Sequence, residues 1–530
     1  MPMHPTRQAP PIPPSEWWER PEDEREIPVA ECDGRRDRKR GNSVRANYRV
    51  NSGVQFRMLS EDQLEELFNS VLHVLEVTGL EVHHEEAREI LEEAGANVDD
   101  LRVRLPSYMV KEALRLAPRS FTLFARDGNP EHDIHIGPGR AHFGPGPTCP
   151  NFIDVETMER RPYVKSDVPL VARTVDALPN IDFCESLGTV DDVHHDLGAL
   201  YEFAGMFPNT SKPIVAWSYD RFDSEGIHEI AIAEAGGQEA FEIRPNYVHY
   251  CEPLSPLVST FEAVDKLLFA ARHRVPLIFT PCPIAGGTAP VTPAGIIVQA
   301  AAESWMGLVL AQTISPGLPF FMGGVLSVMD MSSMILAYGA PELSLMMAGV
   351  TELAHYAGLP LWQTGGCTDS KALDEQAAIE GSMSVFFSAL SGGDLTHDVG
   401  YTESAMTGSI FQLVMMDEAI GYARRITRGI KVDEDTLATD VIKNVGPNGH
   451  YLREEHTRRH YKTEFWYPNL CDRRNYEEWE MMGGQRMSER VISRAQDILA
   501  SHEPSPIKEK TKEVIQEVLA KAEDRVKEPA

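Results

Sequence analysis

Apolar runs of strand length alternate with helical stretches from about residue 180 to residue 428. The strand-like runs cover residues 181–190, 212–219, 246–253, 275–283, 318–328, 359–367 and 392–400. The helical stretches cover residues 196–207, 223–236, 256–273, 293–313, 341–357, 373–390 and 414–428. Apolar strands that alternate with helices indicate βα units and a parallel sheet. The pattern predicts a TIM (β/α)8 barrel, whose eighth strand comes from either residues 141–148 or residues 121–127.

Helical patterns also flank the predicted barrel. Ser60 can cap a first helix, and further helices are expected at 84–94 and 107–117. Near the C-terminus, residues 506–527 have the pattern of a charged helix that lies on the surface or in an oligomer contact. We therefore expect a TIM barrel with an N-terminal helical subdomain and a C-terminal helical extension. The expected parts are a proline-rich, charged arm (1–50), the N-terminal subdomain (51–125), the barrel (126–430) and the extension (431–530).

The charge of the chain excludes some classes of partner. Asp and Glu number 80 against 50 Lys and Arg, so the formal net charge is −30. Such an acidic protein is unsuited to nucleic acid or to anionic membranes, which attract basic surfaces. The seven cysteines include no CxxC pair, and the first residues, MPMHPTRQAPPIPP, lack the apolar segment of a secretory signal. We expect a cytoplasmic protein without a membrane span.

Polar residues and glycine pairs stand at the ends of several predicted strands, where barrel enzymes place their functional groups. Gly365 and Gly366 follow one strand, and their backbone N–H groups could hold an anion. His397 ends the next strand, and Glu252 ends an earlier one. The alternatives are tight turns for the glycines, a structural histidine, and a salt-bridged glutamate.

Cys251, Cys282 and Cys367 each end a different predicted strand, and together they could form a zinc site. The alternative is that they are small buried residues of the core. Aromatic residues gather at the same strand ends and would attract a cation by their ring faces. They are Phe143, Trp217, Tyr219, Tyr250, Trp362 and Tyr401.

Several long segments resemble the trimethylamine methyltransferase superfamily over roughly residues 55–505. They include AHFGPGPTCPNFIDVETMERRPYVKSD, GGCTDSKALDEQAAIEG, LSGGDLTHDVGYTESAMTGS and MMDEAIGYARRITRGI. The resemblance implies a TIM barrel that moves a methyl group from a methylated amine to Co(I) of a separate corrinoid protein, with no cofactor bound by the chain itself. The founding members carry pyrrolysine, whereas every letter of this chain is a standard amino acid. The likeness therefore indicates the branch that acts on quaternary amines such as glycine betaine.

The resemblance also implies roles for particular residues. Phe143 would lie near the methylammonium, and His397 would lie near the substrate carboxylate, assisted by the N–H groups of Gly365 and Gly366. Glu252 and Tyr401 complete the expected substrate-binding set. No residue of the chain is expected to act as the catalytic nucleophile, and a homo-oligomer is expected. Three alternatives remain: a methyltransferase for trimethylamine or another methylamine, a zinc-dependent methyltransferase for a thiol or alcohol, and a barrel that binds a betaine without chemistry.

Overall fold

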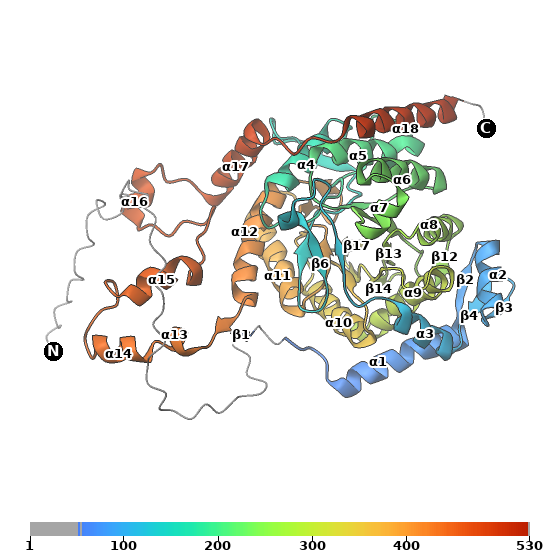
Figure 1. Ribbon diagram of the computed structural model, residues 1–530, viewed down its shortest axis with the longest axis horizontal. Coiled ribbons are helices and arrows are strands. Elements are labelled where there is room, and N and C mark those ends of the chain that lie inside the picture. The colour runs from blue at the N-terminus through green and yellow to red at the C-terminus, as the bar shows by residue number, and fades with distance from the viewer. Residues whose placement is uncertain (1–50, 53–55, 528–530) are drawn as a thin grey trace. The chain divides into compact units, whose positions relative to one another are not determined.

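The computed structural model describes residues 51–52 and 56–527 of the 530-residue chain. Residues 50–530 form one compact unit (Figure 1), and the expected arm of residues 1–50 lies outside the described residues. Among the described residues, a parallel sheet of seven strands has the order β10-β11-β13-β15-β18-β19-β7. Its strands are β7 (His142–Phe143), β10 (Ile214–Ala216), β11 (Tyr247–Cys251), β13 (Leu277–Phe279), β15 (Phe320–Gly323), β18 (Leu361–Thr364) and β19 (Leu395–His397). Every predicted strand from 212–219 onward is therefore confirmed.

A short extended segment, residues 182–184, bonds to both edge strands of this sheet. The N–H of Asp182 donates to the carbonyl of Phe143 at 2.6 Å, on the β7 side. On the β10 side, the N–H of Cys184 donates to the carbonyl of Pro213 at 2.9 Å, and the N–H of Val215 donates to the carbonyl of Cys184 at 3.0 Å. The first predicted run thus lies between the two edges of the sheet, and residues 141–148 supply β7.

Helices follow the strands in alternation and pack around the sheet (Figure 1). They are α4 (Asp167–Ala177), α5 (Gly198–Met206), α6 (Arg221–Ala235), α7 (Gln238–Ile243), α8 (Phe261–Arg272), α9 (Pro293–Ile314), α10 (Pro341–Ala357), α11 (Glu375–Ser391) and α12 (Ile410–Thr427). Among the described residues, α9 is the one helix that is long and apolar enough to cross a membrane. Because 78% of its apolar window is buried inside the protein, α9 has the character of a core helix.

The inner side of the sheet is filled by apolar side chains that alternate with outward-facing ones along each strand. This inner cluster contains Phe183, Val215, Val248, Tyr250, Ile278, Phe321, Trp362 and Leu395. The hairpin of β5 (Phe121–Leu123) and β6 (Ile134–Ile136) packs against it, with the rings of Phe121 and Phe321 5.2 Å apart. Phe124 and Arg126 bond to residues that precede β11 and β10, so the hairpin covers the amino-terminal end of the sheet.

The N-terminal segment is tied to the sheet helices. Helices α1 (Glu61–His73) and α3 (Ser107–Leu116) contact α9, and Ser60 caps α1 as predicted. The segment also contains α2 (Glu85–Glu93) and a small sheet of β2 (Leu80–Val82), β3 (Asn97–Asp99) and β4 (Arg102–Arg104), which β12 (Val258–Ser259) joins in parallel.

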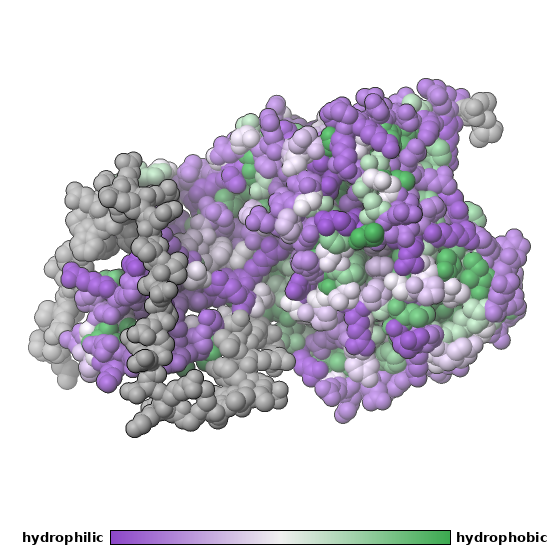
Figure 2. Space-filling model, viewed as in Figure 1, coloured by the Kyte–Doolittle hydropathy of each residue, from purple (hydrophilic) through white to green (hydrophobic). Residues whose placement is uncertain are grey.

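The C-terminal segment runs through β22 (Ile430–Lys431), α13 (Glu434–Leu437), α14 (Thr439–Val445), α15 (Glu455–Glu464), α16 (Tyr476–Met481), α17 (Met487–Ser501) and α18 (Glu509–Lys527). Helix α17 packs on α12 and α4, and α18 packs on α6. Thr511, Val518 and Ala522 of α18 are buried in that contact, which accounts for its apolar stripe. Much of the face drawn in Figure 2 is hydrophilic, as the charge of the chain requires.

Two small sheets follow the carboxyl ends of the parallel strands. One joins β14 (Ile284–Ala285), β16 (Ser327–Asp330) and β17 (Ile335–Ala337). The other joins β8 (Asn151–Ile153), β9 (Arg160–Pro162), β20 (Tyr401–Thr402) and β21 (Thr407–Gly408). These sheets lie in the loops that border the carboxyl-terminal face, where the predicted site residues are found.

Candidate active site

Strand alternation determines which residues face inward at the carboxyl-terminal end of the sheet. Residues two positions beyond an inward-facing side chain face the same way. Glu185 thus follows Phe183, Glu252 follows Tyr250, and His397 follows Leu395. Three strand ends therefore direct a titratable side chain toward the same interior.

Several of these inward-facing side chains have buried polar atoms without a hydrogen-bond partner among the described residues. They are both carboxyl oxygens of Glu185, Oδ2 of Asp398, Nδ1 of His397, Nε1 of Trp362 and Oγ1 of Thr280. Buried polar groups in folded proteins nearly always have a partner, so a set of unpartnered ones needs an explanation such as a ligand or water. The set lies at or near the carboxyl ends of four segments of the parallel sheet, β13, β18, β19 and residues 182–184, which is where ligands bind in such folds.

Glu185 and Asp398 form the electrostatic centre of this set. Both side chains are buried, with exposed fractions of 0% and 1%. Burial raises the pKa of Glu185 well above its usual value, and the nearby carboxylate of Asp398 raises it further. An acid whose ionisation is disfavoured by burial and by a nearby carboxylate favours binding of a cation, because a positive charge would offset both the desolvation and the repulsion.

His397 is held by three neighbours. Its ring stacks on Trp362, and its Nε2 lies 3.1 Å from the hydroxyl of Thr364. Its Nδ1 lies 2.7 Å from Oδ1 of Asp398, without the alignment of a hydrogen bond. The imidazole thus reaches the interior as predicted, and it can donate to an acceptor there.

The glycine pair does not offer the free donors that the sequence predicted. The N–H of Gly365 donates to the carbonyl of His397 at 3.0 Å, as part of the sheet ladder. The N–H of Gly366 donates to the hydroxyl of Ser384 at 2.9 Å, and Gly366 has a φ of +78° that glycine adopts without strain. Both groups are buried and already bonded, so the expectation that they hold a substrate carboxylate was wrong.

Phe143 lies on the other side of the sheet from this set. It pairs in register with Thr396, which bonds to Gln363 on the helix side. The next residue, Gly144, faces inward, because a Cβ there would lie 2.4 Å from Phe183. Phe143 therefore points outward into the core between sheet and helices. The prediction that it contacts the methylammonium was wrong, because the direction of a two-residue strand depends on its register.

Glu252 and Tyr401 lie at the rim of the interior. The hydroxyl of Tyr250 donates to Oε2 of Glu252 at 2.7 Å, while Glu252 itself remains largely exposed. The hydroxyl of Tyr401 accepts from the N–H of Thr148 at 2.8 Å, and the side chain is buried. Burial raises the pKa of Tyr250 and Tyr401 well above the usual value, so both rings stay neutral.

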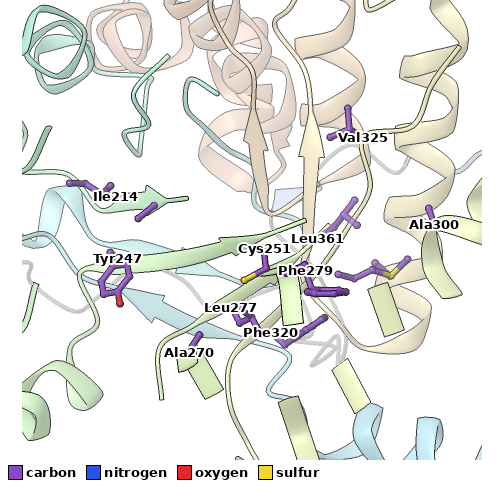
Figure 3. Packing of buried hydrophobic residues seen from close by; sticks show 14 of the residues in the cluster. Ile214, Tyr247, Cys251, Ala270, Leu277, Phe279, Ala300, Phe320, Val325 and Leu361 are labelled. Carbon is purple, nitrogen blue, oxygen red and sulfur yellow. The ribbon is translucent and has the colours of Figure 1, made fainter. Parts of the chain in front are cut away.

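The three cysteines proposed for zinc do not gather around one point. Among the described residues, the one group that brings three ligand atoms within 4.8 Å is Asp435, His456 and His460, in the C-terminal segment. Arg459 already holds the carboxylate of Asp435 at 2.8 Å. Figure 3 displays Cys251 within the hydrophobic core beside Leu277 and Phe279.

The thiols themselves are also poorly suited to a metal. Burial raises the pKa of Cys251 to about 12 and raises the pKa of Cys282 and Cys367 well above the usual value. Because zinc binds the thiolate, such protonated thiols are weak ligands. The interpretation of Cys251, Cys282 and Cys367 as buried core residues accounts for their surroundings.

Sequence reasoning missed Glu185 and Asp398. The signal for Glu185 was the alternation in IDFCES, which places it two residues after Phe183 on an apolar run. Asp398 adjoins His397 in the quoted motif, yet its φ of +70° turns it back toward the interior, which no local pattern indicates.

Comparison with known proteins shows the family of the chain. Residues 31–527 match the family trimethylamine methyltransferase (MTTB). The trimethylamine methyltransferase MttB of Desulfitobacterium hafniense is 33% identical over 88% of this chain and 94% of its own length. The glycine betaine methyltransferase of the same species is 31% identical over 85% of this chain and 94% of its own length. The monomethylamine methyltransferase of Methanosarcina barkeri, a solved structure, has a TM-score of 0.45 at 13% identity over 88% of each chain. The chain therefore belongs to the trimethylamine methyltransferase family and is a methyltransferase.

Proposed function

We propose that this enzyme transfers a methyl group from a quaternary amine of the betaine type to Co(I) of a separate corrinoid protein. The observation that carries the proposal is the inward-facing set of acidic and aromatic side chains at the carboxyl ends of the strands. Glu185 and Asp398 supply negative charge there, and Phe183, Tyr250 and Trp362 supply rings. The names of two relatives, a trimethylamine and a glycine betaine methyltransferase, support a methylated amine as the substrate.

We also infer that the sheet closes into a full (β/α)8 barrel, with residues 182–184 as the eighth strand. The hydrogen bonds of Asp182 to Phe143 and of Cys184 to Pro213 support this closure, because they reach both edges. In a closed barrel, Glu185 and Asp398 face one common interior. This shared interior is what allows a single small ligand to meet them both.

The chemistry requires little from the chain besides binding and orientation. A quaternary ammonium has a fixed positive charge, and loss of a methyl group leaves a neutral amine, so no general acid is needed. The corrinoid of the partner would supply the nucleophilic cobalt that accepts the methyl group. Aromatic faces and buried carboxylates hold the cation while excluding water, and this positions one N–methyl bond toward the open end of the interior.

Of the donors predicted for the carboxylate of a betaine, only His397 is still available. Because Gly365 and Gly366 are bonded within the chain, the imidazole of His397 is the group that would receive the carboxylate. Its Nδ1 has no hydrogen-bond partner among the described residues, although Oδ1 of Asp398 lies 2.7 Å away. A charge-assisted hydrogen bond of this kind contributes about 1.5–3 kcal/mol.

A direct assay tests the proposal. The purified chain is mixed with a reduced corrinoid protein and, in separate reactions, with glycine betaine, carnitine, choline and trimethylamine, and formation of methyl–Co(III) is followed by absorbance. We expect methylation with glycine betaine or carnitine. Absence of methylation with every quaternary amine would overturn the proposal.

Trimethylamine is the second candidate substrate, because the relative at 33% identity carries that name. Protonated trimethylammonium would also pair with Glu185 and Asp398, and its nitrogen must keep that proton while the methyl group leaves, so that the product is neutral dimethylamine. The same assay separates the candidates: methylation by trimethylamine alone would select the second one.

A further inference from the structure

Glu185 stands apart from the other buried carboxylates of the protein. Among the described residues, it is the one acid whose two carboxyl oxygens are both buried without a hydrogen-bond partner. An unpaired buried polar group costs about 1–3 kcal/mol, and an unpaired charge costs more. Such a group persists where something outside the chain completes it, such as a ligand or a proton with water.

Other buried acids have partners from the chain. Glu303 accepts hydrogen bonds from the hydroxyl of Ser255 at 2.7 Å, the N–H of Leu257 at 2.8 Å and the amide of Gln299 at 2.9 Å. Glu202 accepts from the indole of Trp217 at 2.8 Å. The environment of Glu185 is therefore a local feature and is not a general property of this core.

Asp398 faces the same space. Its Oδ2 is buried and unpartnered, while its Oδ1 lies 2.7 Å from Nδ1 of His397. Gly146 leaves room for it, since a Cβ at that position would lie 2.1 Å from Oδ1. The backbone of Asp398 has a φ of +70°, a strained conformation for a residue with a side chain. The fold thus accommodates, at some cost in backbone strain, a second buried carboxylate near enough to Glu185 for its charge to disfavour ionisation of Glu185.

The surrounding titratable groups supply no positive charge for Glu185. The causes that raise its pKa are burial and the charge of Asp398. Tyr250, Tyr401 and Cys184 also sense its charge, and burial raises the pKa of each well above the usual value, so they stay neutral. His397 contacts Asp398, and neither carboxyl oxygen of Glu185 has a hydrogen-bond partner among the described residues. A positive charge for Glu185 must therefore come from a ligand.

We propose that Glu185, with Asp398 beside it, is the counter-charge that receives the methylated ammonium group, and that the arriving cation displaces a proton from this pair. The inference rests on the proposed function for the identity of the cation. In the free enzyme Glu185 keeps its proton, because a fully buried carboxyl without hydrogen-bond donors resists ionisation. The fixed charge of a quaternary ammonium takes the place of that proton, so binding of a small cation is coupled to proton release.

This arrangement distinguishes a cation from a neutral molecule of the same shape. Choline and 3,3-dimethylbutan-1-ol differ by a nitrogen in place of a carbon, and both lack a carboxylate. The site should prefer choline, and the preference should increase with pH. Where the pair is protonated, each pH unit should strengthen choline binding by up to about tenfold.

Calorimetry of the full-length enzyme tests the proposal. Choline is titrated at pH 7 in two buffers with different enthalpies of ionisation, and the difference in heat gives the number of protons released. We expect about one proton per choline bound. Glu185→Gln, which mimics the protonated acid in shape, should weaken choline binding at least about tenfold, abolish proton release and change binding of 3,3-dimethylbutan-1-ol less than about twofold.

Glu303→Gln is the matched control, since Glu303 is equally buried but bonded within the chain. It should leave proton release and the preference for choline unchanged. Thermal unfolding of each variant verifies that it folds. Equal affinity of the unmutated enzyme for choline and the alcohol, or unchanged proton release in Glu185→Gln, would overturn the inference.

The two proposals fail separately. If the enzyme transfers methyl groups from a quaternary amine, and Glu185→Gln binds choline and releases protons as the unmutated enzyme does, the role of Glu185 is refuted and the proposed function stands. Proton-coupled choline binding that depends on Glu185, without methyl transfer from any quaternary amine, would support the cation site and refute the proposed reaction.

Discussion

The imidazole of His397 stacks on the indole of Trp362, with ring centroids 4.3 Å apart and planes inclined by 13°. The two residues occupy adjacent strands, β19 and β18, and both face the interior. The stacking fixes the plane of the imidazole, and Thr364 holds its Nε2. His397 therefore presents its Nδ1 edge toward Asp398.

Replacement of this imidazole tests for a substrate carboxylate. We expect His397→Ala to raise the Kd of glycine betaine by about tenfold or more, since a charge-assisted hydrogen bond contributes about 1.5–3 kcal/mol. Binding of choline, which has no carboxylate, should change by less than about threefold. Titration calorimetry measures both, and an equal loss for the two ligands would assign His397 a packing role.

Two aromatic substitutions, one on each side of the sheet, test which side binds the cation. Phe143→Leu should lower stability by about 1 kcal/mol, as core substitutions of similar volume do, and leave the ratio of choline to 3,3-dimethylbutan-1-ol affinity unchanged. Tyr250→Leu should lower that ratio about twofold to tenfold, because a neutral aromatic face near a cation contributes about 0.5–2 kcal/mol. A larger loss of selectivity in Phe143→Leu would contradict the observed direction of its side chain.

Strands and helices could be predicted because their signals are local. The run that ends at Gly323 is apolar over its whole length, as a parallel strand buried on both sides requires. Helix α12 begins at Ile410, earlier than predicted, because Ser409 caps it and accepts from the N–H of Gln412 at 3.2 Å. Caps of this kind are visible in the sequence only once the strand before them has been placed.

The candidate site was less predictable because it depends on contacts between distant residues. The N–H of Gly366 is occupied by Ser384, and the direction of Phe143 follows its pairing with Thr396. In the sequence, Glu185 looks like an exposed charge at the end of a strand. It is buried because residues 182–184 lie between β7 and β10 and bond to residues on both sides. None of these relationships has a local signature.

The buried carboxyl of Glu202 in α5 gives stability a pH dependence. Burial raises its pKa to about 8 from the ordinary value of 4.5, against the opposing hydrogen bonds of Trp217 and Val190. The unfolded chain releases this proton near pH 4.5 and the folded protein keeps it until about pH 8, so stability falls as pH rises through this window.

We expect Glu202→Gln to remove that contribution. Relative to the unmutated protein, its melting temperature should rise progressively between pH 5 and about 8. Glu112→Gln, which changes an exposed carboxyl on α3, should give a curve parallel to that of the unmutated protein over the same range. Melting temperatures that differ by a constant amount at all pH values would show that Glu202 is already ionised in the folded protein.

An apolar rim at the carboxyl-terminal end of the sheet suggests how the methyl acceptor approaches. Met331, Met334 and Ile335 lie in the β16–β17 hairpin, which follows β15, and they are 58%, 66% and 57% exposed. Val291, which follows β14, is 68% exposed. Exposed methionines are typical of surfaces that bind protein partners, because the thioether adapts its shape to a partner. If the corrinoid protein meets the interior from this end, these side chains lie on its path.

Charged substitutions in this apolar rim should therefore weaken docking of the corrinoid protein without affecting binding of the amine. We expect Met331→Glu combined with Met334→Glu to raise the KM for the corrinoid protein by about tenfold or more, since two desolvated charges would oppose the contact. The Kd of the amine should not change, because these side chains are exposed at the surface whereas Glu185 and His397 are buried. Met481→Glu in α16, where the methionine is 78% exposed, serves as the control and should leave both constants unchanged. Steady-state methyl transfer at varied concentrations of the corrinoid protein measures the effect. An unchanged KM in the double variant, with normal amine binding, would mean that the corrinoid protein docks elsewhere on the enzyme.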